Sequence, residues 1–283
     1  MRRVLERQKD QFDETKPRKT RVNCLSSDYD GTISPIDASR IESRVPLQTR
    51  VMLRQIGSFL PISILTMKDL PFIMPRTPFA QGWSAIGGLE LRIGKRVLKR
   101  ESLEPMLTRI SLAVNYAKSH ITSVGVEIEE KQDSEGNTVA FCVDWRQAKD
   151  PKTAKQEAGY VATYCKGLGL KLIKYETQPF YDVYPVVPDK GWALREMLKE
   201  FGVKNGVLYL GDSETDNAAF RASDVSLGVI HDETPLRALD CDYFVKFELV
   251  PDFLHALLVN DFLFSSDFSM IKPNSYRGEN EHG

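Results

Sequence analysis

The fold of this chain is decided by the stretch SSDYDGT at residues 26–32. A short strand is predicted to lead into Asp28, and open α/β sheets bind ligands outside the carboxyl ends of their strands. Gly31 allows the chain to turn there, so that Asp28 and Asp30 can face one pocket. A carboxylate nucleophile beside a carboxyl acid/base is what an aspartyl-phosphate mechanism requires. The stretch therefore predicts a catalytic pair, Asp28 as nucleophile and Asp30 as acid/base, although an ordinary acidic turn has the same composition.

Outward from this stretch, strands and helices are predicted to alternate. The strands are expected at residues 61–65, 206–210, 225–229 and 243–245, and helices at residues 46–59 and 217–221. Such alternation implies a parallel, doubly wound α/β sheet, which is the fold class expected for a core made of residues 21–103 and 185–265. Residues 1–20 form a charged N-terminal extension in this prediction because they offer no apolar face, and residues 266–283 form a tail.

The middle of the chain, residues 104–184, has a different pattern. Two helices and two strand pairs are expected there. The helices are predicted at residues 104–121 and 151–165, and the strands at residues 124–130, 138–144, 170–174 and 180–183. The polar turn at residues 133–137 joins the first two strands as a hairpin. These elements predict an α+β unit inserted into the α/β core.

A second acidic cluster, GDSETD at residues 211–216, follows another predicted strand. Carboxylate oxygens are hard ligands of the kind that Mg²⁺ prefers, and the ion would offset the charges of Asp28 and Asp212. We expect Asp28, Asp212 and the backbone carbonyl of Asp30 to hold Mg²⁺. Asp216 would ligate the ion directly or orient a bound water.

Two further residues are placed to meet a phosphate group. Thr66 ends the strand predicted at residues 61–65, where its hydroxyl can donate to a phosphate oxygen. Lys190 lies where a helix is expected to begin, so its ammonium and the helix N-terminus together would neutralise a phosphoryl group. Taken alone, Thr66 is also compatible with an ordinary strand end, and Lys190 with a surface position.

Together these four motifs resemble the haloacid dehalogenase superfamily in identity, order and spacing. The inserted unit resembles its α+β cap domain, which closes over the substrate and excludes water. Finer matches resemble the trehalose-6-phosphate phosphatase family: DYDGTISPI at residues 28–36, GDSETDNAAF at 211–220 and EEK at 129–131. This resemblance covers about residues 22–260. It implies a Mg²⁺-dependent phosphomonoesterase that acts through an aspartyl phosphate, with trehalose 6-phosphate as the substrate.

The same resemblance assigns four cap residues to the sugar hydroxyls: Glu129, Lys131, Arg146 and Asp182. A solvated strand face has the same charged composition, so that interpretation of Glu129, Lys131 and Arg146 stays open. The chain also departs from the family. It reads Thr-Met-Lys at residues 66–68 in place of SGR, and Asp182 stands in place of Glu. Further departures are Asp144 for His, Tyr184 for Arg and Ser213 for an aspartate.

Other functions are compatible with these residues. A phosphatase for another glycosyl phosphate, such as sucrose phosphate or mannosylglycerate phosphate, would use the same core chemistry. A sugar phosphomutase would keep the phosphoenzyme and return the phosphate to the sugar. A non-catalytic partner of a glycosyltransferase would have no need for all of Asp28, Asp30, Lys190, Asp212 and Asp216.

The composition limits the partners and the compartment. The 283 residues are 27% charged and 42% hydrophobic with a formal net charge of −1, which is ordinary for a globular protein and favours neither nucleic acid nor a membrane. No window approaches eighteen consecutive apolar residues. The four cysteines form no CxxC pair and the N-terminus has no apolar signal segment, so we expect a cytoplasmic protein with reduced thiols. The expected partners are a small sugar phosphate and a sugar-phosphate synthase.

Overall fold

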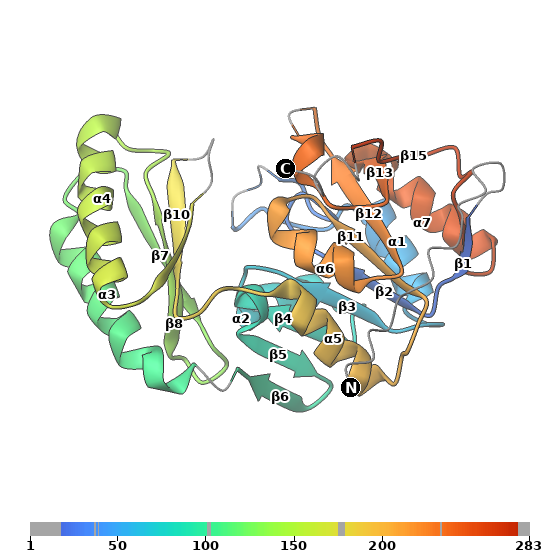
Figure 1. Ribbon diagram of the computed structural model, residues 1–283, viewed down its shortest axis with the longest axis horizontal. Coiled ribbons are helices and arrows are strands. Elements are labelled where there is room, and N and C mark those ends of the chain that lie inside the picture. The colour runs from blue at the N-terminus through green and yellow to red at the C-terminus, as the bar shows by residue number, and fades with distance from the viewer. Residues whose placement is uncertain are drawn as a thin grey trace, which may run out of the picture.

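The computed structural model describes residues 18–36, 38, 40–100, 103–174, 179–232 and 234–276. Figure 1 shows a large α/β part and, at its side, a smaller part that carries α3, α4 and the strands β7 to β10. The large part is called the core below, and the smaller part the cap. Within the described residues, no helix combines the length and the apolarity needed to cross a membrane.

The core contains a nine-stranded sheet with the order β15-β13-β12-β11-β2-β3-β4-β5-β6. The strands from β13 to β4 in this order run parallel. They are β2 (Cys24–Ser27), β3 (Ile62–Leu65), β4 (Gly82–Ala85), β11 (Val207–Gly211), β12 (Val225–Ile230) and β13 (Tyr243–Lys246). Antiparallel strands flank them, β5 (Glu90–Ile93) and β6 (Arg96–Lys99) on one side and β15 (Ile271–Pro273) on the other. The predicted doubly wound α/β sheet is confirmed.

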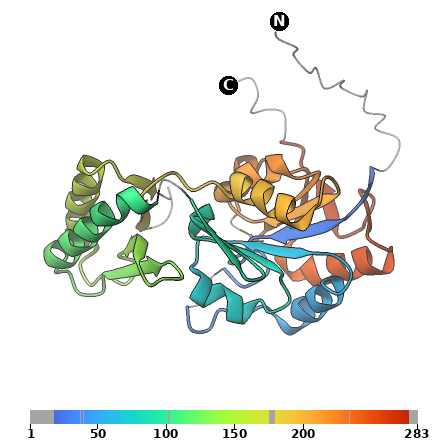
Figure 2. The same cartoon turned by 90° about the horizontal axis from the view of Figure 1, so that it is seen from below.

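Helices cover both faces of this sheet (Figure 2). The helices α1 (Leu47–Ile56) and α7 (Val250–Val259) lie on one face, and α5 (Lys190–Phe201) and α6 (Asn217–Ala222) on the other. Because successive side chains of a strand point to opposite faces, β11 supplies both layers. Leu208 packs in the cluster that holds α1 and α7, and Tyr209 in the cluster that holds α5 and α6. Burial on both faces explains why β2 and β11 have no exposed residue.

The cap is a four-stranded antiparallel sheet in the order β7-β8-β10-β9, covered on one face by two helices. Its elements are β7 (Glu127–Gln132), β8 (Thr138–Asp144), β9 (Lys171–Lys174), β10 (Phe180–Tyr184), α3 (Leu107–His120) and α4 (Pro151–Gly167). Phe141, Val143, Tyr181 and Val183 point toward the helices and form an apolar cluster with them. The alternate residues point the other way and are mostly polar. The predicted hairpin of β7 and β8 is present.

The sheet is larger than the sequence predicted. The strands β4 to β6 were not predicted, because they are four residues each and a glycine turn or a 3-10 turn interrupts their alternation. The first residues of the expected tail, which starts at residue 266, include β15, and this strand pairs antiparallel with β13. Likewise β1 (Lys19–Arg21) pairs with β14 (Leu263–Ser265), so the expected N-terminal extension ends in a strand. Residues 1–17 and 277–283 lie outside the described residues.

Candidate active site

Asp28 lies directly after β2 at the carboxyl edge of the sheet, between the ends of β11 and β3. Its backbone N–H donates to the carbonyl oxygen of Leu210 at 2.9 Å, so the strand pairing itself fixes the residue. The residue is only 7% exposed. One carboxylate oxygen, Oδ2, lies 3.0 Å from Nζ of Lys190. The predicted nucleophile is therefore a buried carboxylate beside a single ammonium group.

Lys190 is the first residue of α5, as the sequence predicted, and its side chain reaches inward from the start of that helix. Its Nζ lies 3.0 Å from Oδ2 of Asp28 and 2.7 Å from Oδ1 of Asp216. Burial opposes the charge on Lys190, but attraction by Asp216 and Asp28 outweighs it, so the pKa of Lys190 lies above its ordinary value. Lys190 is therefore a permanent cation in the site, and the surface position is ruled out.

Asp216 accepts hydrogen bonds from several groups of the site. Its Oδ1 accepts hydrogen bonds from Lys190 and from the Tyr209 hydroxyl at 2.6 Å. Its Oδ2 accepts from the backbone N–H groups of Asp212 and Ser213 at 3.1 and 3.2 Å. Both oxygens thus have donors and the residue has no exposed surface. The sequence predicts that Asp216 ligates the ion or orients a bound water; in the structure its two oxygens accept from protein donors and fix Lys190 and the backbone at Asp212.

Asp212 approaches the loop of the nucleophile very closely. Gly31 has a φ of +74°, and a Cβ at this position would stand 2.1 Å from Oδ2 of Asp212. Thr32 donates its hydroxyl to the other carboxylate oxygen of Asp212 at 3.3 Å. Glycine is therefore required at residue 31 for two reasons, the left-handed backbone and the space that Asp212 occupies.

The acidic residues fit a divalent cation. Asp28, Asp212 and Asp216 each offer an oxygen, and these oxygens lie within 4.8 Å of one another. Burial raises the pKa of Asp28 to about 7 although Lys190 lowers it, and burial together with Asp28 and Asp216 raises the pKa of Asp212 well above its ordinary value. Burial is the largest cause of both pKa shifts, and repulsion between the neighbouring carboxylates adds to it. A set of oxygen donors with excess negative charge suits Mg²⁺.

Asp30 lies nearer to solvent than Asp28. Nζ of Lys68 is 3.9 Å from its Oδ2, and the hydroxyl of Ser43 donates to its Oδ1 at 3.5 Å. Burial raises the pKa of Asp30, with Lys68 and then Lys190 acting in the opposite direction. A raised carboxyl pKa is what a general acid needs near neutral pH, so the environment suits the role predicted for Asp30.

Thr66 follows β3, the strand next to β2, and is buried at the same edge of the sheet. Its N–H donates to the carbonyl oxygen of Ser84 at 2.9 Å, and its hydroxyl accepts from the N–H of Lys68 at 3.2 Å. The hydroxyl hydrogen is not used by that contact. The residues predicted for the core site therefore come together at one sheet edge: Asp28, Asp30, Thr66, Lys190, Asp212 and Asp216.

In the cap, Lys131 and Asp182 form a buried pair. Nζ of Lys131 lies 2.7 Å from Oδ1 of Asp182 and 3.0 Å from the hydroxyl of Tyr184. Lys131, Asp182 and Tyr184 are 5%, 4% and 0% exposed. The three residues share the face of the cap sheet that points away from α3 and α4. Lys131 is therefore not part of a solvated surface, and the open alternative is excluded for this residue.

Glu129 and Arg146, the other predicted sugar-binding residues, have different partners. Glu129 accepts from Arg40 at 2.5 Å, and Arg40 also contacts both carboxylate oxygens of Asp69 at 2.9 and 3.1 Å. Since Asp69 belongs to the core, Arg40 connects the core to the cap. Arg146 donates from Nε and Nη2 to its neighbour Asp144 at 2.8 and 2.5 Å. Arg146 is half exposed and is not brought to the Lys131–Asp182 pair.

Two residues that contact predicted site residues were not singled out from the sequence: Tyr209, which donates to Asp216, and Arg40, which donates to Glu129. Tyr209 lies inside a buried strand, where an aromatic residue is normally assigned to the core and its hydroxyl carries no signal. Arg40 lies in an irregular segment whose contacts depend on the folded chain. Gly191, which directly follows Lys190, is required by packing. A Cβ at Gly191 would stand 2.4 Å from the carbonyl oxygen of Ala218, so α5 and α6 pack closely at the start of α5.

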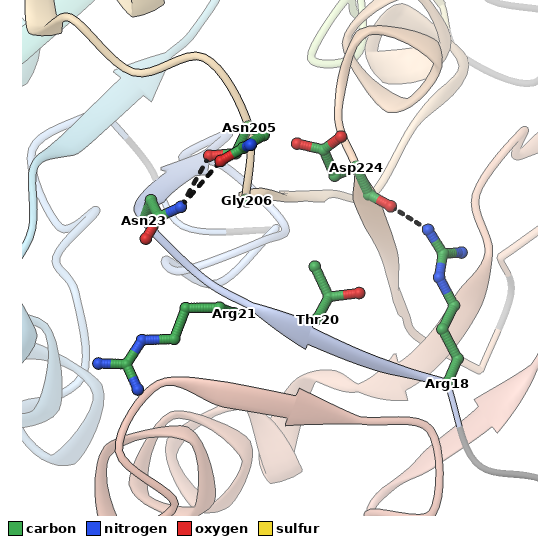
Figure 3. A pocket seen from close by; sticks show the side chains of 7 residues that line it. All are labelled: Arg18, Thr20, Arg21, Asn23, Asn205, Gly206 and Asp224. Atoms are coloured by element: carbon green, nitrogen blue, oxygen red, sulfur yellow. Dashed lines mark hydrogen bonds between the residues drawn. The ribbon is translucent and has the colours of Figure 1, made fainter.

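A hollow of about 370 Å³ (Figure 3) lies at the amino edge of the sheet, opposite the edge that carries Asp28. It is lined by Arg18, Thr20, Arg21, Asn23, Asn205, Gly206 and Asp224. Its polar groups contact one another or nearby residues, as Asn23 does with Asn205 at 3.1 and 3.2 Å and Arg21 with Asp261 at 2.8 Å. None of the predicted site residues lines it, so this hollow is separate from the acidic site.

Comparison with known proteins gives matches by structure. No protein-family profile and no curated protein sequence matches this chain. The structure matches a trehalose-6-phosphate phosphatase related protein with a TM-score of 0.67 and 17% identity, over 84% of this chain and 97% of the other. It matches the C-terminal domain of C. albicans trehalose-6-phosphate phosphatase with a TM-score of 0.61 and 17% identity, over 84% and 92%. A HAD subclass IIB sugar phosphatase matches with a TM-score of 0.57 and 14% identity, over 85% and 100%.

These matches define a class of fold. The chain has the fold of the phosphatases of the haloacid dehalogenase (HAD) superfamily, with its mostly parallel core sheet and an inserted cap. Within that class, the structures it resembles are trehalose-6-phosphate phosphatases and subclass IIB sugar phosphatases. The fold that the sequence motifs implied is thereby confirmed.

Proposed function

We propose that this protein is a Mg²⁺-dependent phosphomonoesterase that hydrolyses a sugar phosphate, trehalose 6-phosphate, through an aspartyl phosphate on Asp28. One observation carries the proposal: the Lys190 ammonium is buried between Asp28 and Asp216, with Asp212 beside them. Removing several charges from water costs several kcal/mol per ion by a rough estimate, and a fold gains little from such a cluster alone. A phosphate and a divalent cation are what this cluster would complement.

In the proposed reaction, a carboxylate oxygen of Asp28 attacks phosphorus and the bond to the sugar oxygen breaks. Asp30 donates its proton to that leaving oxygen and then takes a proton from the water that attacks the aspartyl phosphate. Lys190 and the Thr66 hydroxyl hold the phosphate oxygens. When bound by Asp28, Asp212 and the backbone carbonyl of Asp30, Mg²⁺ would offset the negative charge that phosphate brings to the carboxylates. The second step releases inorganic phosphate and regenerates the carboxylate of Asp28; the sugar has already left in the first step.

The cap supports a sugar as the leaving group. Lys131 and Asp182 present a fixed, buried pair of opposite charges, and hydrogen bonds to charged groups contribute about 1.5–3 kcal/mol each. Glu129 lies on the same face of β7 as Lys131, two residues away. Arg146 would have to leave Asp144 to reach a ligand. We therefore propose Glu129, Lys131 and Asp182 as the main sugar contacts. Arg146 would contribute less to sugar binding, because it is bonded to Asp144.

A second substrate class is favoured by one feature of this face. Tyr184 and Asp182 stand where the trehalose-6-phosphate phosphatase family has Arg and Glu, and Tyr184 occupies one donor of Lys131. A different glycosyl group, such as that of sucrose phosphate or mannosylglycerate phosphate, would meet this altered set. The core chemistry would be the same, so only the identity of the sugar distinguishes the two proposals.

The experiment is a panel of sugar phosphates assayed for released phosphate, with Mg²⁺ and with EDTA, using wild type and Asp28→Asn. The amide fits the volume of the carboxylate but cannot attack phosphorus, so this variant should stay folded and release no phosphate. Turnover of trehalose 6-phosphate by the wild type alone is the expected result. An isomeric sugar phosphate in place of free phosphate would identify a mutase, and near-normal turnover by Asp28→Asn would refute the nucleophile assignment.

A further inference from the structure

His231 connects the loop after β12 to the loop that carries the proposed nucleophile. It directly follows β12, at the same carboxyl edge of the sheet as Asp28. Its Nε2 lies 2.7 Å from the carbonyl oxygen of Gly31, 200 residues away in the sequence. A carbonyl oxygen can only accept, so Nε2 carries the proton and donates in this contact. No sequence motif had singled out this histidine.

The imidazole ring packs on an aromatic neighbour, and a turn holds the backbone of His231. Phe247 stacks on it, with ring centroids 5.2 Å apart and an interplanar angle of 28°. The backbone N–H of His231 donates to the Thr234 hydroxyl oxygen at 2.8 Å, and the Thr234 N–H donates back to the His231 carbonyl oxygen at 3.1 Å. A side chain already fixed by packing loses little further entropy when it forms its hydrogen bond. The donor is therefore preorganised toward Gly31.

Gly31 is the residue at which the nucleophile loop meets Asp212. Its N–H donates to the Ser34 carbonyl oxygen at 2.8 Å, and this bond orients the peptide group that also contains the Asp30 carbonyl. The Gly31 carbonyl belongs to the next peptide group, and His231 orients that one. The two bonds hold the backbone on both sides of the left-handed residue that leaves room for Asp212.

We infer that His231 is a positioning residue for the Mg²⁺ site: through the Gly31 carbonyl it keeps the loop of Asp28 and Asp30 in register with Asp212. The inference rests on the proposed function, because the metal belongs to that proposal. Without the imidazole N–H, the Gly31 carbonyl loses this partner and the loop can shift beside the ligands. Removing a partner that orients metal ligands weakens metal binding by about 10- to 100-fold.

The test measures Mg²⁺ binding to the full chain by isothermal titration calorimetry, together with thermal unfolding in the absence of metal. His231→Phe keeps a ring on Phe247 and removes the N–H. His231→Gln keeps an N–H donor at about the same reach. We expect the Kd for Mg²⁺ to rise about tenfold or more in His231→Phe and to return to within about threefold of wild type in His231→Gln.

Asn274→Ala is the matched control. Like His231, Asn274 connects two segments through a side-chain N–H, but it lies at the amino edge of β13, away from the proposed metal site. Its Nδ2 donates to the carbonyl oxygens of Leu239 and Cys241, both at 3.0 Å. This variant should lower Tm and leave the Kd for Mg²⁺ unchanged. An unchanged Kd in His231→Phe, with a lowered Tm as in the control, would show that His231 is a structural connection only and would overturn the inference.

Two further outcomes are decided by the same design. Should His231→Phe not fold, His231→Leu also removes the imidazole N–H and is measured with the same expectation for the Kd. Wild-type protein that shows no Mg²⁺ binding overturns the inference outright. In that case the release of phosphate in the substrate panel decides separately whether the proposed phosphatase activity also fails.

Discussion

Gly31→Ala is the substitution whose effects follow most directly from the structure. Gly31 has a φ of +74°, and a residue with a Cβ in that region costs about 1–2 kcal/mol. The new Cβ would also stand 2.1 Å from Oδ2 and 2.7 Å from the carboxyl carbon of Asp212. Non-bonded contacts of this kind are optimal near about 3.5 Å, so Asp212 has to retreat by about 1 Å or more. One substitution thus strains the backbone and displaces a proposed metal ligand.

These two effects have separate readouts. Backbone strain lowers Tm, by about 2–4 °C per kcal/mol for a chain of this size. Displacement of a reacting group or ligand by about 1 Å lowers kcat/KM by about 10²-fold. We therefore expect Gly31→Ala to unfold a few degrees earlier than wild type and to lose about two orders of magnitude in the release of phosphate. The first is measured by thermal unfolding and the second by the phosphate assay.

Gly202→Ala separates the two effects. Gly202 ends α5 with a φ of +70°, and nothing lies within 4 Å of the position that its Cβ would take. It therefore carries the same backbone cost without displacing a neighbour. The two variants should lose similar stability, and only Gly31→Ala should lose activity. Equal activity in both variants would refute the reasoning that Gly31 leaves room for Asp212.

The remaining predictions concern the acid, the metal and the cap. Asp30→Asn should slow hydrolysis of the sugar phosphate by about 10²–10⁴-fold. It should slow hydrolysis of an aryl phosphate less, because an acidic leaving group needs no proton, and equal losses on both substrates would contradict the acid role. EDTA abolishes phosphate release, Mg²⁺ restores it and Ca²⁺ inhibits through its looser coordination, whereas full activity after exhaustive chelation excludes the metal. Lys131→Ala removes the ammonium group that offsets the buried charge of Asp182, so urea unfolding should show a loss of about 3–5 kcal/mol, and the double variant Lys131→Met, Asp182→Leu should lose much less. Equal stability of these two variants would show that Asp182 is compensated by other groups.

The core site could be predicted from the sequence because its geometry is local. Asp28 and Asp212 directly follow strands, and Lys190 begins a helix. In a parallel sheet the carboxyl ends of neighbouring strands meet at one edge, so placing each residue at its strand end already places them together. The order of the strands puts β2 between β11 and β3, which completes that placement.

The partners of the cap residues could not be predicted in the same way. Alternation along a strand predicts which residues share a face, whereas Glu129 and Lys131 were assigned together by the family resemblance; in the structure they lie two residues apart on β7. Alternation does not predict the register between strands. In the observed register, Cys142 of β8 pairs with Glu129 of β7 on one side and with Asp182 of β10 on the other. Arg40 reaches Glu129 from an irregular segment of the core, for which no periodic pattern exists. The strands β1 and β15 were missed for a similar reason, since three residues are too few to show alternation.

The two ion pairs of the cap face differ in how readily a substrate can change them. The Lys131–Asp182 pair is buried, so opening it would leave charges out of water, and the pair should stay intact when a ligand binds. The Arg40–Glu129 pair has side chains that are 40% and 25% exposed, and pairs of this kind contribute about 0–1 kcal/mol. A sugar hydroxyl can therefore displace Arg40 from Glu129 at little cost, while Lys131 and Asp182 offer an unchanging surface. Selectivity among sugars should then depend on Glu129 and Arg40, at the boundary where the cap meets the core.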